Sequence, residues 1–324
     1  MKATRLRHFT RPGTAALLIL TLLAVPLAAQ ESAGKAAPAA SEAIGRPGET
    51  GKKPGLKEAA RDFIADTGRI WSSPFRIKNR DVGPLIILTA ATGFLIAADE
   101  DIRDAVKGYT AEHEWAQDAG PVITQMGALG AAATAGIFFG AGLIFKDGRA
   151  RDTGWLAAGA IAQTFLVDFF IKGMSGRRRP FVADGEDHWA GPAGFFKRHD
   201  PDYGGLYDSF PSGHSATAFS VATVVALQYR HRPWVPVLAY TIAAGVGLSR
   251  LTEDRHWMSD VFAGAVIGHF VGRLVVRSRQ KPQRLVPVLG CSGRSVAFGF
   301  HYNLDPVDWG VGWGIRGILR RRCT

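Results

Sequence analysis

The chain has 324 residues, 47% of them hydrophobic, and a formal net charge of +11. A positive net charge suits binding to nucleic acid, to anionic lipid or to a phosphate substrate. Here the cations cluster beside the ends of long uncharged segments, as over residues 273–284. This placement favours a membrane protein and argues against nucleic acid binding. The two cysteines, Cys291 and Cys323, are too few for a disulfide framework or a Cys-rich zinc site; they could pair or remain free thiols.

Residues 1–29 have the three parts of a secretory signal peptide: a basic start, an apolar centre over 15–25, and small residues at 28–29. Leu27 is larger than the residue preferred at that position of a cleavage site, so an uncleaved N-terminal anchor is the alternative. Residues 30–83 start with a polar linker over 32–53, which has too few apolar residues to fold. A surface helix is predicted to follow over 56–71.

Residues 84–279 are predicted to form an all-α, multi-pass transmembrane bundle of about six helices. The apolar runs cover 84–98, 121–145, 155–174, 215–229, 233–248 and 258–276, and about 20 residues cross a bilayer core. Gly and Ala are dense over 127–136, which suits close packing of membrane helices. A soluble helical bundle is the alternative, and the 121–145 run, which has no ionisable side chain, argues against it.

Residues 280–324 are predicted to be a separate tail with some β structure. Alternating residues over 285–289 and 296–302 predict a β-hairpin, and residues 310–315 repeat the pattern weakly.

Loop charges predict the orientation of the bundle. Basic residues over 146–151, 230–232 and 273–284 mark one side as cytoplasmic. The polar segments at the other helix ends are therefore expected to face the periplasm from a bacterial inner membrane. A cleaved signal peptide followed by six full spans would give the opposite result, so one run must fail to cross, and 84–98 is the candidate.

Three polar segments stand at the ends of the apolar runs. They are Lys172-Gly-Met-Ser-Gly-Arg-Arg-Arg179-Pro180, then Pro211-Ser212-Gly213-His214, then Ser249-Arg250 followed by His256 and Asp260. Written as K-x6-RP, PSGH and SR-x5-H-x3-D, this ordered set resembles the signature of the type 2 phosphatidic acid phosphatase superfamily. That superfamily includes membrane lipid phosphatases, soluble bacterial acid phosphatases and vanadium haloperoxidases. The likeness covers about residues 84–279.

The physical chemistry of the same residues predicts a phosphate site. Arg179 and Arg250 offer planar forks to phosphate oxygens, and Lys172 offers a point charge. Such a cage would stabilise the phosphoryl charge without a metal ion or other cofactor. Ser212 and Gly213 precede a helix, whose first N–H groups bind phosphate and where Gly lets the backbone approach closely. The alternatives are an ordinary N-cap for Ser212 and interfacial anchoring for the cations.

The two histidines are predicted to carry the chemistry. His256 and Asp260 are four residues apart and share a helix face. A carboxylate beside an imidazole fixes its tautomer and makes the other nitrogen a better nucleophile, so His256 is predicted to be the nucleophile and Asp260 its orienting partner. His214 is predicted to protonate the leaving oxygen and later to activate water. The resemblance implies the same roles, with a phosphohistidine on His256.

The remaining charged residues near these segments are expected to be structural. Arg177 and Arg178 are predicted to be interfacial anchors, and residues 99–101 an exposed acidic loop. Asp168 is one helical turn before Lys172 and is expected to pair with it. His269 is expected to pack or to form an interhelical hydrogen bond.

The predicted function is a metal-independent phosphatase acting on a lipid phosphate or pyrophosphate, such as undecaprenyl pyrophosphate, phosphatidic acid, phosphatidylglycerophosphate or a lipid A phosphate. The alternatives are a periplasmic acid phosphatase acting on soluble esters, a haloperoxidase, and a non-catalytic lipid-binding or transport protein. The expected partners are the lipid substrate and the bilayer, and not nucleic acid.

Overall fold

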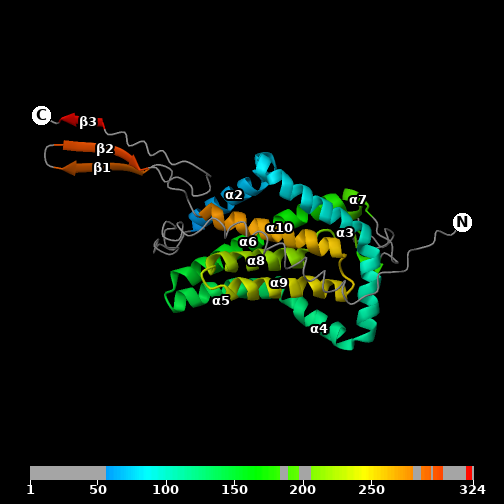
Figure 1. The fold of residues 1–324 in the computed structure, drawn as a ribbon. Helices are drawn as coiled ribbons and strands as arrows, with labels where there is room; N and C mark the ends of the chain where they lie inside the picture. The colour runs from blue at the N-terminus through cyan, green and yellow to red at the C-terminus, as the bar shows by residue number, and fades with distance from the viewer. Residues whose placement is uncertain are drawn as a thin grey trace.

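The structure is a computed structural model that describes residues 56–182, 189–196, 206–279, 286–292, 295–301 and 319–322. The predicted signal peptide, the polar linker and Cys323 lie outside these residues. The helices are α2 (Leu56–Ser72), α3 (Asn79–Glu112), α4 (Glu114–Gln125), α5 (Ala128–Ile144), α6 (Gly148–Ser175), α7 (Gly191–Phe196), α8 (Gly213–Gln228), α9 (Trp234–Thr252) and α10 (Met258–Arg279), with short 3-10 helices at Ser73–Arg76 and Pro180–Val182 (Figure 1).

Each predicted apolar run is helical over most of its length, so the predicted fold class, an all-α multi-pass bundle, is confirmed. Within the described residues, α3, α6, α9 and α10 are long and apolar enough to cross a membrane, and α4 with α5 makes a fifth candidate. Residues 121–145 are not one helix, because the chain bends by 45° between α4 and α5. α8 has 16 residues, fewer than the roughly 20 that a span needs. The predicted six helices thus include four or five candidate spans.

The run at 84–98, expected to fail to cross, is part of α3, which has 34 residues. At 1.5 Å per residue this helix is about 51 Å long, whereas the hydrocarbon core of a bilayer is about 30 Å thick. Length and composition therefore make α3 a candidate span, and the expectation that residues 84–98 fail to cross stays an untested prediction. The second half of α3 extends beyond the apolar run and lies along the end of the bundle where α9 ends and α10 begins (Figure 1).

α8 forms the centre of the bundle and is buried along most of its length between α6, α9 and α10 (Figure 1). Two glycines let α10 lie directly against it. A Cβ on Gly264 would lie 2.5 Å from the backbone oxygen of Ser212, and one on Gly268 would lie 2.1 Å from that of Ala216. Because the two glycines are one turn apart, they share a face of α10. This packing fixes the start of α10 against the start of α8.

The outer surface of the bundle is apolar. Ile86, Ile137, Phe165 and Leu238, on four different helices, are all more than half exposed, which suits contact with lipid chains. The predicted surface helix is confirmed as α2, and it rests on α6, where the side-chain amide of Gln163 donates to the backbone oxygen of Phe63 at 3.0 Å.

The predicted hairpin in the tail is confirmed and gains a third strand. β1 (Val286–Ser292), β2 (Ser295–His301) and β3 (Leu319–Arg322) form an antiparallel sheet in that order. The third strand does not coincide with residues 310–315, which lie outside the described residues.

Candidate active site

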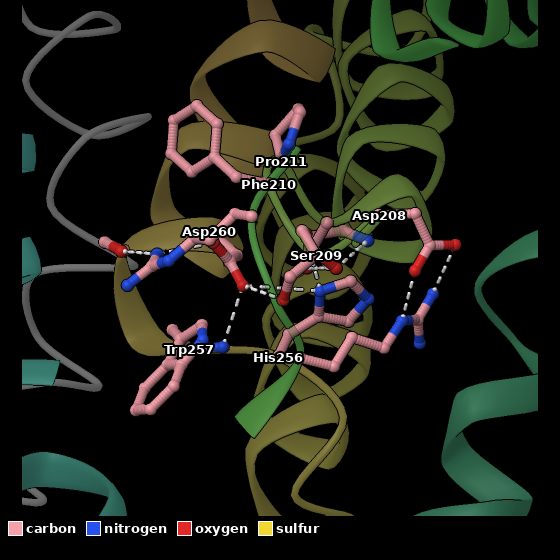
Figure 2. Close-up of polar contacts among 12 residues, drawn as sticks. Asp208, Ser209, Phe210, Pro211, His256, Trp257 and Asp260 are labelled. Carbon is pink, nitrogen blue, oxygen red and sulfur yellow. Dashed lines mark hydrogen bonds and ion pairs between the residues drawn. The ribbon is translucent and has the colours of Figure 1, made fainter. Parts of the chain in front are cut away.

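The three polar segments of the sequence meet at the loop that leads into α8. Figure 2 shows residues 208–211 of this loop beside His256 and Asp260. Lys172 donates from Nζ to two backbone oxygens of this loop, at 2.6 and 2.7 Å. Nδ1 of His256 lies 2.8 Å from the backbone oxygen of Ser209. The N–H of Ser212 donates to the backbone oxygen of Asp260 at 3.0 Å. The loop therefore joins α6, α8 and α10 at one end of the bundle.

A tight turn at the end of α6 separates Lys172 from Arg179. Gly176 ends the helix with a φ of +50°, the left-handed conformation that glycine adopts most readily. A Cβ at this position would lie 1.9 Å from the backbone oxygen of Gly191, so no larger residue fits. Beyond the turn, the N–H of Arg179 donates to the backbone oxygen of Leu206 at 3.1 Å, which places Arg179 beside the same loop.

Arg179 is oriented by Asp208. Its Nε and Nη2 donate to the two carboxylate oxygens of Asp208 at 2.6 and 3.1 Å. These bonds use one edge of the guanidinium, and the other edge carries donors that suit phosphate oxygens. Burial raises the pKa of Asp208, but the hydrogen bond and charge of Arg179 and the charge of Lys172 outweigh it, so that the pKa lies below its usual value. Asp208 is therefore a carboxylate at neutral pH.

The other two cations also have partners within the bundle. Arg250 donates from Nη1 to Oγ1 of Thr124 at 2.7 Å and to Glu253 at 3.1 Å. Its Nε is buried and has no hydrogen-bond partner among the described residues, so it is a donor that a bound phosphate could satisfy. Lys172 forms the predicted ion pair with Asp168, at 3.8 Å.

The start of α8 combines a helix cap with a close backbone approach. Ser212 is the N-cap, and its hydroxyl oxygen accepts hydrogen bonds from the N–H and the Oγ–H of Ser215 at 3.5 and 3.2 Å. Because that oxygen accepts both bonds, its own proton can be donated to a phosphate oxygen. A Cβ on Gly213 would lie 3.0 Å from a carboxylate oxygen of Asp168.

The tautomer of His256 is fixed by a backbone carbonyl. Since a carbonyl oxygen only accepts hydrogen bonds, Nδ1 must donate its proton to Ser209, and Nε2 keeps its lone pair. Asp260, predicted to orient this ring, lies farther away, with Oδ2 at 3.5 Å from Nδ1. In Figure 2 the second ring nitrogen of His256 lies on the side of Asp208.

His256 is neutral at pH 7. Burial lowers its pKa to about 3, helped by the positive charges of Arg179 and Lys172 and opposed by Asp260. A neutral imidazole with an unprotonated Nε2 beside two cations is the form in which a histidine attacks an electrophile.

His214 lies in the first turn of α8, where the bend between α4 and α5 reaches it. A Cβ on Gly127, at that bend, would lie 2.9 Å from the imidazole ring. Burial, followed in decreasing order by the charges of Arg250, Arg179 and Lys172, lowers the pKa of His214 to about 4. All three predicted phosphate-binding cations thus act on this ring.

Two predictions about charged residues are wrong. Arg177 was expected to be an interfacial anchor and Asp99 part of an exposed acidic loop, but they are 0% and 1% exposed. Arg177 donates from Nη1 to Oδ1 of Asp260 at 2.6 Å and from Nη2 to Oδ2 of Asp99 at 2.7 Å. α3 stays helical through residue 99 and brings this carboxylate inside, where a buried charge requires a charged partner.

α3 also holds the loop that carries His256. Arg103 donates from Nε and Nη2 to the two carboxylate oxygens of Asp254 at 2.6 and 2.7 Å. Asp254 has a φ of +55°, which is unfavourable for most residues that have a side chain. The ion pair therefore stabilises a strained turn two residues before His256.

Away from this site, His269 has a structural contact. His269 lies with Nδ1 at 3.0 Å from the hydroxyl of Tyr240, the interhelical hydrogen bond that was expected. Within the described residues, no group of three His, Cys, Asp or Glu side chains could hold a metal ion.

Sequence reasoning missed Asp208, Ser209, Arg103 and the Asp99–Arg177 pair. Asp208 and Ser209 directly precede the PSGH segment, so their position was a usable signal. The partner of His256 in Ser209 is a backbone oxygen, which every residue type has, so no residue type could reveal it. Asp99 gave a stronger signal, because a carboxylate directly after an apolar run often faces the interior of a bundle.

Comparison with known proteins agrees with the motif resemblance. Residues 153–284 match the model of the PAP2 superfamily. Over 80 residues, the chain is 50% identical to Lipid A 1-phosphatase from Porphyromonas gingivalis, a match that covers 24% of this chain and 18% of that protein. The chain thus matches less than a fifth of the length of this relative.

Two solved structures are also similar to this chain. The transmembrane PAP2 type phosphatidylglycerolphosphate phosphatase from Bacillus subtilis is 26% identical, with a TM-score of 0.45 over 61% of this chain and 94% of that chain. Aquifex aeolicus LpxE is 20% identical, with a TM-score of 0.41 over 55% of this chain and 94% of that chain.

The resemblance to the type 2 phosphatidic acid phosphatase superfamily is confirmed over residues 153–284. This stretch contains all three motif segments, and it begins later than the predicted catalytic region, which starts at residue 84.

Proposed function

We propose that this protein is a membrane lipid phosphatase that transfers a phosphoryl group first to His256 and then to water. The observation that carries the proposal is the contact between Nδ1 of His256 and the backbone oxygen of Ser209, at 2.8 Å. It leaves Nε2 as a nucleophile next to cations that suit phosphate oxygens. The PAP2 match over the same residues supports the proposal.

In the first step, the lone pair of Nε2 on His256 attacks phosphorus, and the bond from phosphorus to the lipid oxygen breaks. Lys172, Arg179 and Arg250 stabilise the charge on the three remaining phosphate oxygens. His214 passes the proton of the substrate monoanion to the leaving oxygen. The products are the dephosphorylated lipid and a phosphohistidine.

In the second step, water attacks phosphorus and its proton passes to His214. The bond between phosphorus and Nε2 breaks, His214 gives the proton to the departing phosphate, and both histidines return to their neutral starting forms. Because the pKa of His214 is about 4 in the empty site, this residue is neutral at pH 7. The proton for the first step therefore arrives with the substrate, on a phosphate monoanion.

The substrate we propose is a lipid with a terminal phosphate or pyrophosphate. The exposed apolar outer surface of the bundle supports a substrate that stays in the bilayer. Identity with a Lipid A 1-phosphatase favours a lipid A phosphate among the candidates.

Purified protein in detergent, tested against undecaprenyl pyrophosphate, phosphatidic acid, phosphatidylglycerophosphate and lipid A, tests the function. Wild type should release phosphate from at least one of them in excess EDTA, and His256→Ala should not. His231→Ala, an exposed histidine at the other end of the bundle, is the matched control and should keep full activity. Turnover by His256→Ala, or a strict need for magnesium, would contradict the mechanism.

We further propose that the site faces the periplasm from a bacterial inner membrane. The support is the group of cations at the opposite end of the bundle, because Lys and Arg flank the cytoplasmic ends of spanning helices. In this group, Nη1 of Arg149 lies 2.9 Å from Nε2 of His231. With Cys291 and Cys323 changed to Ser, an impermeant thiol reagent should label Asp118→Cys in intact cells and Arg232→Cys only after lysis. The reverse pattern would place the site in the cytoplasm.

A further inference from the structure

Arg177 joins two carboxylates from different parts of the fold. It lies beyond the end of α6 and contacts Asp260 in the first turn of α10 and Asp99 in α3. Ser259 completes the group: its hydroxyl accepts from Nη1 of Arg177 at 2.6 Å and donates to Asp99. Its N–H also donates to Asp99, at 2.9 Å.

The donors around Asp99 favour its ionised form. Its two oxygens accept from the guanidinium of Arg177 and from the N–H and hydroxyl of Ser259, and a protonated acid would lose part of this acceptor capacity. Asp260 likewise accepts from Arg177, from the hydroxyl of Ser209 at 2.6 Å and from the N–H of Trp257 at 2.9 Å.

The charges of this buried triad sum to minus one. Two carboxylates, Asp99 and Asp260, are balanced by one guanidinium, Arg177, and all three side chains are 0% exposed. Without Asp99, the guanidinium would cancel the carboxylate behind His256. Without Arg177, two carboxylates would be buried with no cation between them, which is unfavourable.

Two aromatic rings pack against the guanidinium of Arg177. The guanidinium carbon of Arg177 lies 4.7 Å from the ring centre of Trp189 and 5.2 Å from that of Trp257. Such rings attract a cation and exclude water, and charges interact more strongly where water is excluded. The group is thus placed to act electrostatically on the imidazole that neighbours Asp260.

We infer that Asp99 and Arg177 are positioning residues for phosphoryl transfer: they hold Asp260 in place and keep a net charge of minus one behind His256. The inference rests on the proposed function, because it matters only if His256 becomes positively charged when it binds phosphorus. A phosphorylated imidazole with its Nδ1 proton retained is a cation, and a negative group behind it stabilises it. Asp99 is therefore expected to affect kcat rather than KM.

The experiment compares variants whose triads differ in net charge. Asp99→Asn brings the charge to zero, and the double variant Asp99→Asn with Arg177→Met restores it to minus one. Asp101→Asn removes a carboxylate from the exposed side of the same helix and is the matched control. Each purified protein is assayed for kcat and KM with the best lipid substrate and for its melting temperature.

The expected result is a roughly tenfold loss of kcat in Asp99→Asn with KM within about twofold of wild type, and at least about threefold recovery in the double variant. Asp101→Asn should match wild type. The inference is overturned by wild-type kcat in Asp99→Asn, by a double variant no more active than Asp99→Asn, or by equal losses in Asp99→Asn and Asp101→Asn.

Two controls keep the result decisive. If wild type releases phosphate from no substrate, or His256→Ala is as active as wild type, the proposed function fails, whereas the outcomes above concern the triad alone. If Asp99→Asn is not recovered as folded protein, Ser259→Ala replaces it, because it keeps every charge but loosens Asp99. We then expect about a threefold loss of kcat, and unchanged kcat would overturn the inference.

Discussion

Replacing Asp260 by Asn separates the charge behind His256 from the tautomer of its ring. In serine protease triads the aspartate fixes the tautomer of its histidine, and the same substitution lowers kcat by about 10⁴. Here the backbone oxygen of Ser209 fixes the tautomer, at 2.8 Å from Nδ1. In Asp260→Asn the nucleophile should therefore keep its lone pair on Nε2, and only the electrostatic contribution should be lost.

The size of that contribution follows from the distances. Asp260 lies 3.5 Å from Nδ1 of His256, and two unit charges at that separation interact by about 5 kcal/mol at an effective dielectric constant of about 20. Arg177, only 2.6 Å from the carboxylate, weakens this interaction, and Asp99 offsets the charge of Arg177 only in part. A remainder of about 2–3 kcal/mol corresponds to a roughly 30- to 160-fold fall in kcat.

Rapid-quench assays of phosphate release by Asp260→Asn measure this loss, with Asp118→Asn as an exposed control. One donor to residue 260 loses its acceptor in the variant, so we also expect the free energy of unfolding to fall by about 1–3 kcal/mol. A loss of kcat near 10⁴ would refute the reasoning, because it would mean that Asp260 sets the tautomer. A loss below fivefold would show that its charge has no effect on the reaction.

Two further predictions concern pH and the loop that carries His256. The pKa values of His256 and His214 are about 3 and 4, so both are neutral at pH 7 and the substrate supplies the catalytic proton. We therefore expect kcat/KM to fall as the pH rises through about 6, where a phosphate monoester loses its second proton. We also expect kcat/KM to fall below a pH of about 3, where His256 becomes protonated. A profile that rises from pH 6 to 8 would contradict this. Arg103→Met breaks the bidentate pair with Asp254 and should lower kcat about tenfold, with partial recovery in Arg103→Lys; kcat equal to wild type in Arg103→Met would show that the loop needs no such support.

The helices were predictable because apolar runs fix where buried helices lie, whatever their partners. The broken pair α4 and α5 was not predictable from hydropathy, because Met126 and Gly127 at the bend are as apolar as the residues around them. The bend depends on tertiary contacts, since Gly127 packs against His214. Likewise, the length of α3 depends on what its polar second half contacts.

The candidate site was predictable to the extent that it depends on residue type. Cations, imidazoles and a Ser-Gly helix start have recognisable chemistry at recognisable spacings, and the fold brings them together. The supporting groups were not predictable, because Arg177 looks like any interfacial cation until Asp99 and Asp260 are seen on either side of it. The backbone oxygen of Ser209 has no signature in the sequence at all.

The most direct test of the account is to trap the phosphohistidine. In His214→Ala, a ³²P-labelled aryl phosphate can still phosphorylate His256, because its leaving group departs without a proton, but no base remains to activate water. If His256 is the nucleophile, labelled protein accumulates, the label is stable in alkali and lost in acid, and it maps to the peptide containing His256. Release of labelled phosphate without any labelled protein, or a label that persists in the variant His214→Ala with His256→Ala, would contradict this role of His256.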